Sequence, residues 1–235
     1  MSAVTVTERD AVTLIRLDRP PVNAIDLPTL GALAAAIDQA CARGLPLVLT
    51  GRDGAFSAGI DVKEAMGYAP EQRAAMVTGV NRLCLVTYRA AVPVVAALSG
   101  HAIGGGLVLA LCCDHRVGAA RRSTYALPEA RAGVPFPAGA MAVVRAELSP
   151  ATARRLALGD QGYGPEEALS AGILDELAPP EAVVDRAVEA ARRLGALPAG
   201  TFRLVKHQLR AAALAELEAA VSAGPDALVQ RWLST

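Results

Sequence analysis

Hydrophobic and polar residues are arranged with two different spacings in the first part of the chain. Residues 4–8 and 11–17 alternate between apolar and polar around a polar turn, which predicts a β-hairpin. Residues 27–43 instead carry apolar side chains at helical spacing, at Leu30, Leu33, Ala34, Ile37 and Cys41. Asp26 suits the N-cap of this helix and Gly44 suits its C-terminal stop.

Two short apolar runs farther along, 45–50 and 92–98, are predicted to be buried strands. A glycine-rich loop follows each run, at 51–61 and 100–106, and each loop leads into a helical pattern. Further short strands are expected at 116–119, 124–127 and 173–177, and mainly helical segments from 137 and over 181–235. Strands that alternate with helices favour an α/β fold with crossover connections.

Composition narrows the class of protein. The 235 residues are 53% hydrophobic and 20% charged, which suits a packed core rather than a disordered chain. The 23 basic and 23 acidic residues balance, so general binding to nucleic acid or to a membrane surface is not expected. Aromatic residues make up only 3% of the chain, which also argues against a surface for stacking bases.

The cysteines and the apolar runs bear on where in the cell the protein is located. The four cysteines lack a paired C-x-x-C spacing, so we expect reduced buried thiols and no metal site. The N-terminus shows no secretory signal pattern. The most apolar stretch, 94–113, is interrupted by glycines, which makes a single membrane-spanning helix a poor interpretation. These features predict a cytoplasmic protein.

The two glycine-rich loops are the candidate site of chemistry. One carries the sequence FSAGIDVKE at 56–64 and the other SGHAIGGG at 99–106. A loop that begins a helix presents backbone N–H groups without partners, and glycine lets a ligand approach them. Two such loops side by side could direct two N–H donors at one developing oxyanion. Ser99 and His101 do not suggest a hydrolase triad, because no G-x-S-x-G motif surrounds Ser99.

Five segments in order resemble motifs of the enoyl-CoA hydratase/isomerase (crotonase) superfamily. They are RLDRPPVNAID, FSAGIDVKE, PVVAALSGHAIGGGLVLALCCDHRVGA, YALPEARAGV and GPEEALSAGILDEL, and they span about residues 14–178. The resemblance implies an α/β crotonase-like spiral of β-β-α repeats over 1–180, with a C-terminal helical region over 181–235. It also implies assembly as a homotrimer or hexamer.

The resemblance also implies roles for individual residues. It places the oxyanion-hole N–H groups at Ile60 and Gly105, beside Gly104. Coenzyme A, which is part of the substrate, would lie along Ala24, Ala58 and the Ile60–Asp61 turn, and no separate cofactor is expected. Lys206 in the C-terminal region is a candidate contact for the CoA phosphates.

One position departs from the pattern of the family's hydratases, which use two glutamates. The first of these corresponds to Val108 and the second to Glu129. A valine transfers no proton, so hydration by paired carboxylates is not favoured. The single glutamate resembles that of enoyl-CoA isomerases, in which one carboxylate moves a proton from C2 to C4. Walls formed by Val108, Val134 and Phe136 would raise the pKa of Glu129 by desolvation.

The leading interpretation is therefore an enoyl-CoA isomerase with Glu129 as the acid and base. Three alternatives remain open at this stage. The chain could be an enoyl-CoA hydratase, another crotonase such as an acyl-CoA hydrolase or dehydratase, or a catalytically inactive CoA-binding subunit. Turnover of 2-enoyl-CoA and of 3-enoyl-CoA distinguishes them.

Overall fold

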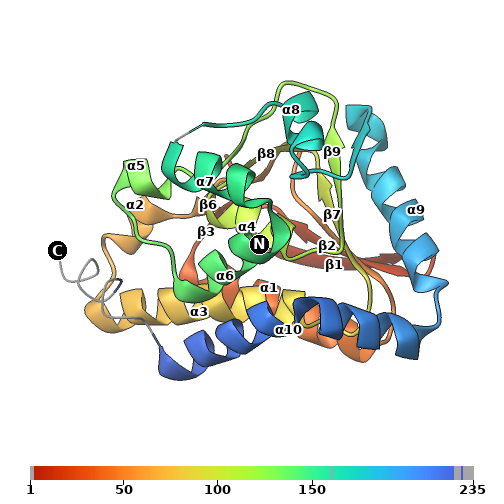
Figure 1. Ribbon diagram of the computed structural model, residues 1–235, viewed down its shortest axis with the longest axis horizontal. Helices are drawn as coiled ribbons and strands as arrows, with labels where there is room; N and C mark the ends of the chain where they lie inside the picture. Colours follow the sequence, from red (N-terminus) through yellow and green to blue (C-terminus); the bar gives the residue numbers. More distant parts are fainter. Residues whose placement is uncertain (1–2, 160, 225–228, 230–235) are drawn as a thin grey trace.

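Strands and helices alternate along most of the chain, as Figure 1 shows. The computed structural model describes residues 3–159, 161–224 and 229. The strands are β1 (Val4–Arg9), β2 (Val12–Leu17), β3 (Ala24–Ile25), β4 (Leu47–Thr50), β5 (Gly54–Ser57), β6 (Gly59–Ile60), β7 (Val94–Leu98), β8 (Gly100–Ile103), β9 (His115–Ala119), β10 (Tyr125–Ala126) and β11 (Glu176–Ala178). The helices are α1 (Leu27–Ala42), α2 (Val62–Ala65), α3 (Pro70–Tyr88), α4 (Gly105–Leu111), α5 (Glu129–Ala132), α6 (Ala138–Glu147), α7 (Pro150–Gly159), α8 (Pro165–Ser170), α9 (Val183–Gly195) and α10 (Ala199–Ala223), with a 3-10 turn η1 (Pro180–Ala182).

The strands form a repeating β-β-α pattern. In the main sheet, of order β1-β2-β4-β7-β9-β11, only the β1–β2 pair is antiparallel. Each of β4, β7 and β9 is followed by a short strand, β5, β8 or β10, that belongs to a second, parallel sheet. A helix directly follows β8 and β10, whereas β6 lies between β5 and α2. The chain thus winds through two sheets and a layer of helices in successive turns, which is the spiral that the family resemblance implies.

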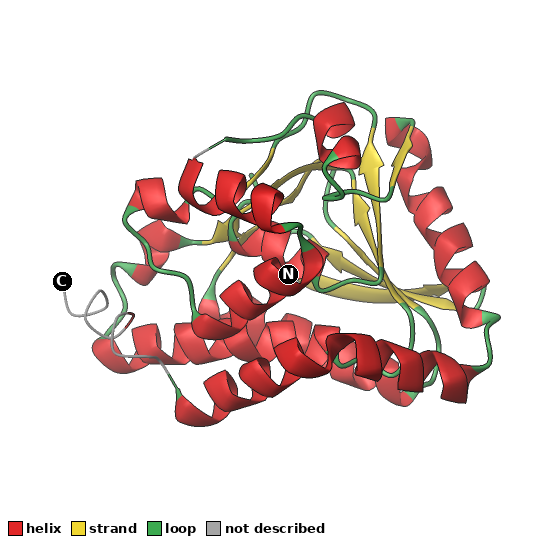
Figure 2. Ribbon diagram, viewed as in Figure 1, coloured by secondary structure: helices red, strands yellow, loops and turns green. Residues whose placement is uncertain are grey.

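Helices cover the two faces of the main sheet unequally. The larger hydrophobic core lies between one face and α1, α3, α4, α6 and α10. The second core lies under α9, which packs against β4, β7 and β9 on the opposite face. Figure 2 shows α9 alone along its side of the sheet, whereas α1, α3 and α10 lie together. α9 does not fill this side of the sheet, because a groove lies over β1 and β2 beside it.

The expected hairpin and first helix agree with the structure. The Asp26 carboxylate accepts a hydrogen bond of 2.8 Å from the Thr29 amide and so caps α1. Gly44 follows the helix with φ +73°, a conformation that favours glycine. In the described residues we find no helix of the length and hydropathy needed to cross a membrane.

Several short strands were not expected from the sequence. The loop expected at 51–61 contains β5 and β6, and the one expected at 100–106 contains β8 and the first turn of α4. These strands have two to four residues, and their partners are far away in the chain. Their pairing is a long-range effect that local patterns do not encode. The strand expected at 173–177 begins only at Glu176.

The C-terminal helices are integrated with the rest of the fold. α9 packs on the main sheet, and α10 packs on α3 and α6. The division of the chain at residue 180 into a spiral and a helical region stays a prediction.

Candidate active site

The turn that joins β5 to β6 is held from beneath by Asn23 and Ser57. Asn23 is fully buried, and its side-chain amide donates to the carbonyls of Leu17, Ala55 and Phe56 at 3.0–3.1 Å. The Ser57 hydroxyl donates to the Asn23 carbonyl at 2.7 Å and accepts from the Gly59 amide at 3.0 Å. This network fixes the backbone immediately before Ile60. Asn23 was not singled out from the sequence, although it lies in the first of the family-like segments.

The Ile60 amide is directed away from β3. The Asp61 amide donates to the Ile25 carbonyl at 2.9 Å, and alternate residues of a strand face opposite sides of the ladder. Gly105 is the first residue of α4, so its N–H has no acceptor within the helix. A methyl group added at Gly105 would lie 3.8 Å from the Ile60 nitrogen. The backbones of Ile60 and Gly105 therefore lie next to each other. Their role as the two oxyanion-hole donors, which the family resemblance implies, stays a prediction.

Glycine is required where the two turns meet. A Cβ at Gly59 would lie 2.7 Å from the Ile103 carbonyl oxygen and 2.9 Å from the Gly105 nitrogen. Gly104 has φ +54° and ψ −128°, a backbone conformation that is unfavourable for every residue except glycine. A Cβ at Gly104 would lie 2.9 Å from Oε1 of Glu129. The carboxyl group is thus placed directly beside the second turn.

Glu129 has the environment of a proton-transfer group. It begins α5, and its Oε2 atom is buried without a hydrogen-bond partner in the part of the chain that the structure describes. Burial raises the pKa of the Glu129 carboxyl to about 7, against a smaller opposing effect of its own backbone N–H. Near neutral pH such a carboxyl group is present in both protonation states. A group that first takes a proton and then returns it needs both states.

The other residues that the sequence analysis assigns to the pocket lie in three different parts of the fold. Val134 and Phe136 are half-buried and follow α5, where the Val134 amide donates to the Glu129 carbonyl at 2.9 Å. Val108 is 1% exposed within the main core. Ala24 pairs with Gly59 in the β3–β6 ladder, next to the turn.

Asp61 and Ala58 complete the turn. The Ala58 amide donates to the Val22 carbonyl at 3.0 Å, and Asp61 caps α2 by accepting from the Glu64 amide at 3.1 Å. A hydrogen bond from the Arg19 side chain lowers the pKa of the Asp61 carboxyl. Asp61 therefore stays ionised, and its contacts with Arg19 and with the Glu64 amide fix the backbone directly after Ile60.

Arg19 is a positioning residue that sequence reasoning missed. Its guanidinium donates to the Ala24 carbonyl at 3.1 Å and to Asp61 at 2.7 Å. It also pairs with Asp26 at 3.1 Å and with Glu64 at 2.6 Å. One side chain thus links the caps of α1 and α2 with β3. The position of Arg19 within the RLDRPPVNAID segment was the available signal, but Asp61 and Glu64 lie too far away in sequence to be inferred as its partners.

The structure does not support Lys206 as a phosphate contact. The side chain is 8% exposed, and its ammonium group donates to Asp114 at 2.8 Å and to the Val92 carbonyl at 3.3 Å. Arg210 also pairs with Asp114, at 3.2 Å, and the two cations fix α10 against the end of α4. A buried, paired ammonium is not available to an external phosphate, so the sequence-based assignment is corrected: Lys206 is a structural residue.

The Asn23 network gives a stability prediction. Replacing Asn23 by alanine removes the donor that three buried carbonyls share, and we expect the free energy of unfolding to fall by about 3 kcal/mol. Urea denaturation at one fixed protein concentration measures this change. Gln39→Ala in α1 is the matched control, because that amide is exposed. Equal stability of the two variants would contradict the role given to Asn23.

Comparison with known proteins agrees with this arrangement. The chain matches the family described as "Enoyl-CoA hydratase/isomerase" over residues 7–231. It is 29% identical over 211 residues to the human mitochondrial enoyl-CoA delta isomerase 1, covering 88% of this chain and 70% of that protein. It is 32% identical over 194 residues to the carnitinyl-CoA dehydratase of Salmonella enteritidis PT4, covering 80% of this chain and 73% of that protein.

A solved structure shows the same fold. The crystal structure of a probable enoyl-CoA hydratase from Mycobacterium tuberculosis H37Rv superposes with a TM-score of 0.89 at 33% identity, covering 94% of each chain. Together with the spiral of β-β-α turns, this identifies the fold class as crotonase-like. The chain belongs to the enoyl-CoA hydratase/isomerase family and is an enzyme of that family.

Proposed function

We propose that the chain is an enoyl-CoA isomerase that moves the double bond of a 3-enoyl-CoA thioester to the 2-position. One observation carries this proposal. A buried carboxyl, that of Glu129, lies beside the turn that presents the Gly105 amide. The family resemblance supports the proposal, because it assigns the position of the hydratases' first glutamate to Val108, which transfers no proton. A single acid and base matches a proton shuttle better than it matches the addition of water, which the hydratases carry out with two carboxylates.

The proposed reaction has two steps. The thioester carbonyl oxygen accepts hydrogen bonds from the Ile60 and Gly105 amides, and the ionised Glu129 carboxylate takes a proton from C2. The electrons of the C–H bond move onto the carbonyl oxygen and form a dienolate, which the two amides stabilise. Protonated Glu129 then returns the proton to C4 as the double bond forms between C2 and C3. The carboxylate is regenerated, so the cycle needs no other reactant.

The remaining features of the proposal follow from this placement. The pantetheine part of coenzyme A runs past Ala24 and Ala58, and the acyl chain lies toward Val134 and Phe136. The only coenzyme involved is the CoA carried by the substrate. The resemblance to the family supports a homotrimer or hexamer as the active form. The cysteine pattern of the sequence supports a cytoplasmic location.

Hydration remains the second candidate, because relatives of this chain include proteins named as a hydratase and a dehydratase. The test uses purified protein with trans-3-hexenoyl-CoA and, separately, with trans-2-hexenoyl-CoA. Conjugation of the first, seen as a rise in the ultraviolet absorbance of the conjugated thioester, supports the isomerase. Hydration of the second with no turnover of the first supports the hydratase. Tight binding of both thioesters without turnover supports an inactive CoA-binding subunit.

The pKa of Glu129 sets the expected pH dependence. The first step needs the carboxylate, and burial raises the pKa of the free group to about 7. We therefore expect kcat/KM for the 3-enoyl-CoA to rise about tenfold per pH unit below that pKa and to level off above it. A profile measured between pH 5 and about pH 9 tests this. A rate that is already level at pH 5 would show that Glu129 is not the base or is not desolvated.

A further inference from the structure

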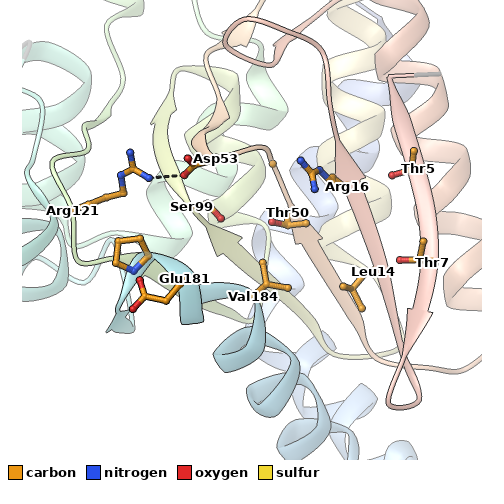
Figure 3. Close-up of a pocket in the computed structure, with 12 residues that line it drawn as sticks. Thr5, Thr7, Leu14, Arg16, Thr50, Asp53, Ser99, Arg121, Glu181 and Val184 are labelled. Atoms are coloured by element: carbon orange, nitrogen blue, oxygen red, sulfur yellow. Dashed lines mark hydrogen bonds and ion pairs between the residues drawn. The ribbon is translucent and has the colours of Figure 1, made fainter. Parts of the chain in front are cut away.

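The open part of the main sheet forms a groove on the side that α9 covers. The groove has a volume of about 760 Å³, within the range of small-molecule sites. Figure 3 shows its residues, which come from β1 and β2, from the end of β4, from the segments after β4, β7 and β9, and from η1 and the start of α9. None of Ile60, Gly105 and Glu129 lines it. The groove is therefore separate from the candidate active site.

Two rows of side chains cross the floor of the groove. The strand register places Thr5 opposite Arg16 and Arg16 opposite Thr50, which gives a polar row. The neighbouring row pairs Thr7 with Leu14. Val184 of α9 faces Leu14 across the groove in Figure 3, so this second row has an apolar part. A polar row beside an apolar patch matches a ligand with a charged head and a compact organic body.

Some donors in the groove have weak contacts or none within the part of the chain that the structure describes. Among the side chains drawn in Figure 3, the one interaction is the ion pair between Arg121 and Asp53. Arg16 reaches outside the groove only to Asp18, at a long 3.8 Å. The hydroxyls of Thr5 and Ser99 add further donors. The Thr50 hydroxyl already donates to the Ala97 carbonyl at 3.3 Å, so it can only accept a further hydrogen bond. The polar row thus offers the Thr5 hydroxyl and a guanidinium with one long ion pair as donors, while Asp53 is already paired with Arg121.

The position of the groove also favours a ligand site. Thr50 ends β4, and Ser99 directly follows β7, so the polar end of the groove lies at the carboxyl ends of parallel strands. Open α/β sheets commonly bind ligands outside the carboxyl ends of their strands.

We propose that this groove is a second ligand site that takes a small phosphate monoester. The phosphate lies over the row of Thr5, Arg16 and Thr50, and the organic part lies against Leu14 and Val184. A guanidinium is suited to phosphate because its planar set of donors matches phosphate oxygens. A phosphate group also supplies more acceptor oxygens and more charge than a carboxylate, which fits the surplus of donors.

Calorimetric titration with phenyl phosphate tests the proposal, with methyl phosphate and benzoate as comparisons. We expect phenyl phosphate to bind more tightly than either, since methyl phosphate lacks the apolar body and benzoate lacks the phosphate. Arg16→Gln should weaken the binding at least about fivefold, because it removes a charge-assisted contact. Glu181→Gln should strengthen it about twofold, because the Glu181 carboxylate lines the groove and repels an anion.

Arg203→Gln is the matched control, because Arg203 is an exposed arginine of α10 outside the groove. It makes the same change in net charge as Arg16→Gln and should leave binding unchanged. The titration is repeated with saturating dephospho-coenzyme A, which occupies the acyl-CoA site but carries no phosphate monoester. Binding that is lost with dephospho-coenzyme A, that Arg16→Gln leaves unaltered, or that is undetectable at millimolar phenyl phosphate would overturn the proposal. These outcomes do not depend on isomerase activity.

Discussion

Glu129→Gln is expected to lower kcat for a 3-enoyl-CoA by about 10³-fold, within the range for loss of a general acid and base. The amide has nearly the same shape as the carboxyl group but cannot take a proton from C2. Binding of the thioester should be retained, because the Ile60 and Gly105 amides are unchanged. Steady-state kinetics together with direct titration of a non-reactive acyl-CoA separates the two effects.

The same variant should be more stable than the wild type above neutral pH. Burial raises the folded-state pKa of Glu129 above its unfolded value, so ionisation disfavours folding. The penalty is absent below the unfolded pKa, grows as the pH rises toward about 7, and is complete above it. We expect Glu129→Gln to gain about 1–3 kcal/mol at pH 8 and nothing at pH 4.

Glu218→Gln is the control for both measurements, because Glu218 is an exposed residue of α10. It should alter neither kcat nor the pH dependence of stability. A Glu129→Gln protein that turns over 3-enoyl-CoA at the wild-type rate would end the assignment of Glu129 as acid and base. An inactive protein that is also less stable at pH 8 would point to misfolding instead.

Gly104→Ala is expected to have the second large effect, a loss of about 10²-fold or more in kcat. The new methyl group would lie 2.9 Å from Oε1 of Glu129, so the carboxyl group must move. The φ of +54° and ψ of −128° also disfavour alanine, and the Gly105 amide would turn with the backbone. Both the base and one oxyanion donor are therefore displaced together.

Gly172→Ala separates backbone strain from contact with Glu129. Gly172 also has a positive φ, +72°, but a methyl group there meets no atom within 4 Å. This variant should lose some stability and keep its kcat. The double variant Gly104→Ala, Glu129→Gln should be only slightly slower than Glu129→Gln alone, because residues that act as a unit are not additive. Fully additive losses in kcat would show that Gly104 acts independently of the carboxyl group.

The sequence was sufficient for the fold class and for the main elements. The hairpin, the Asp26-capped helix and the buried strands before each glycine-rich loop follow from local spacing and local hydrogen bonds. The glycine pattern also pointed to the two loops, because glycine marks where the backbone must come close to another group. The resemblance to the family, and not the pattern, named Ile60 and Gly105 within them. Such signals are contained within a few neighbouring residues, so they can be read without coordinates.

Only the tertiary structure showed which residues hold the site in place and which basic side chains are exposed to an external ligand. Arg19 and Asn23 act through partners that are distant in the chain, and β5, β6 and β8 exist only because they pair with distant strands. Lysine side chains are usually exposed, yet that of Lys206 is buried and paired with Asp114. Burial and the charge of a neighbour depend on the packing of segments far apart in sequence, and no local pattern records them.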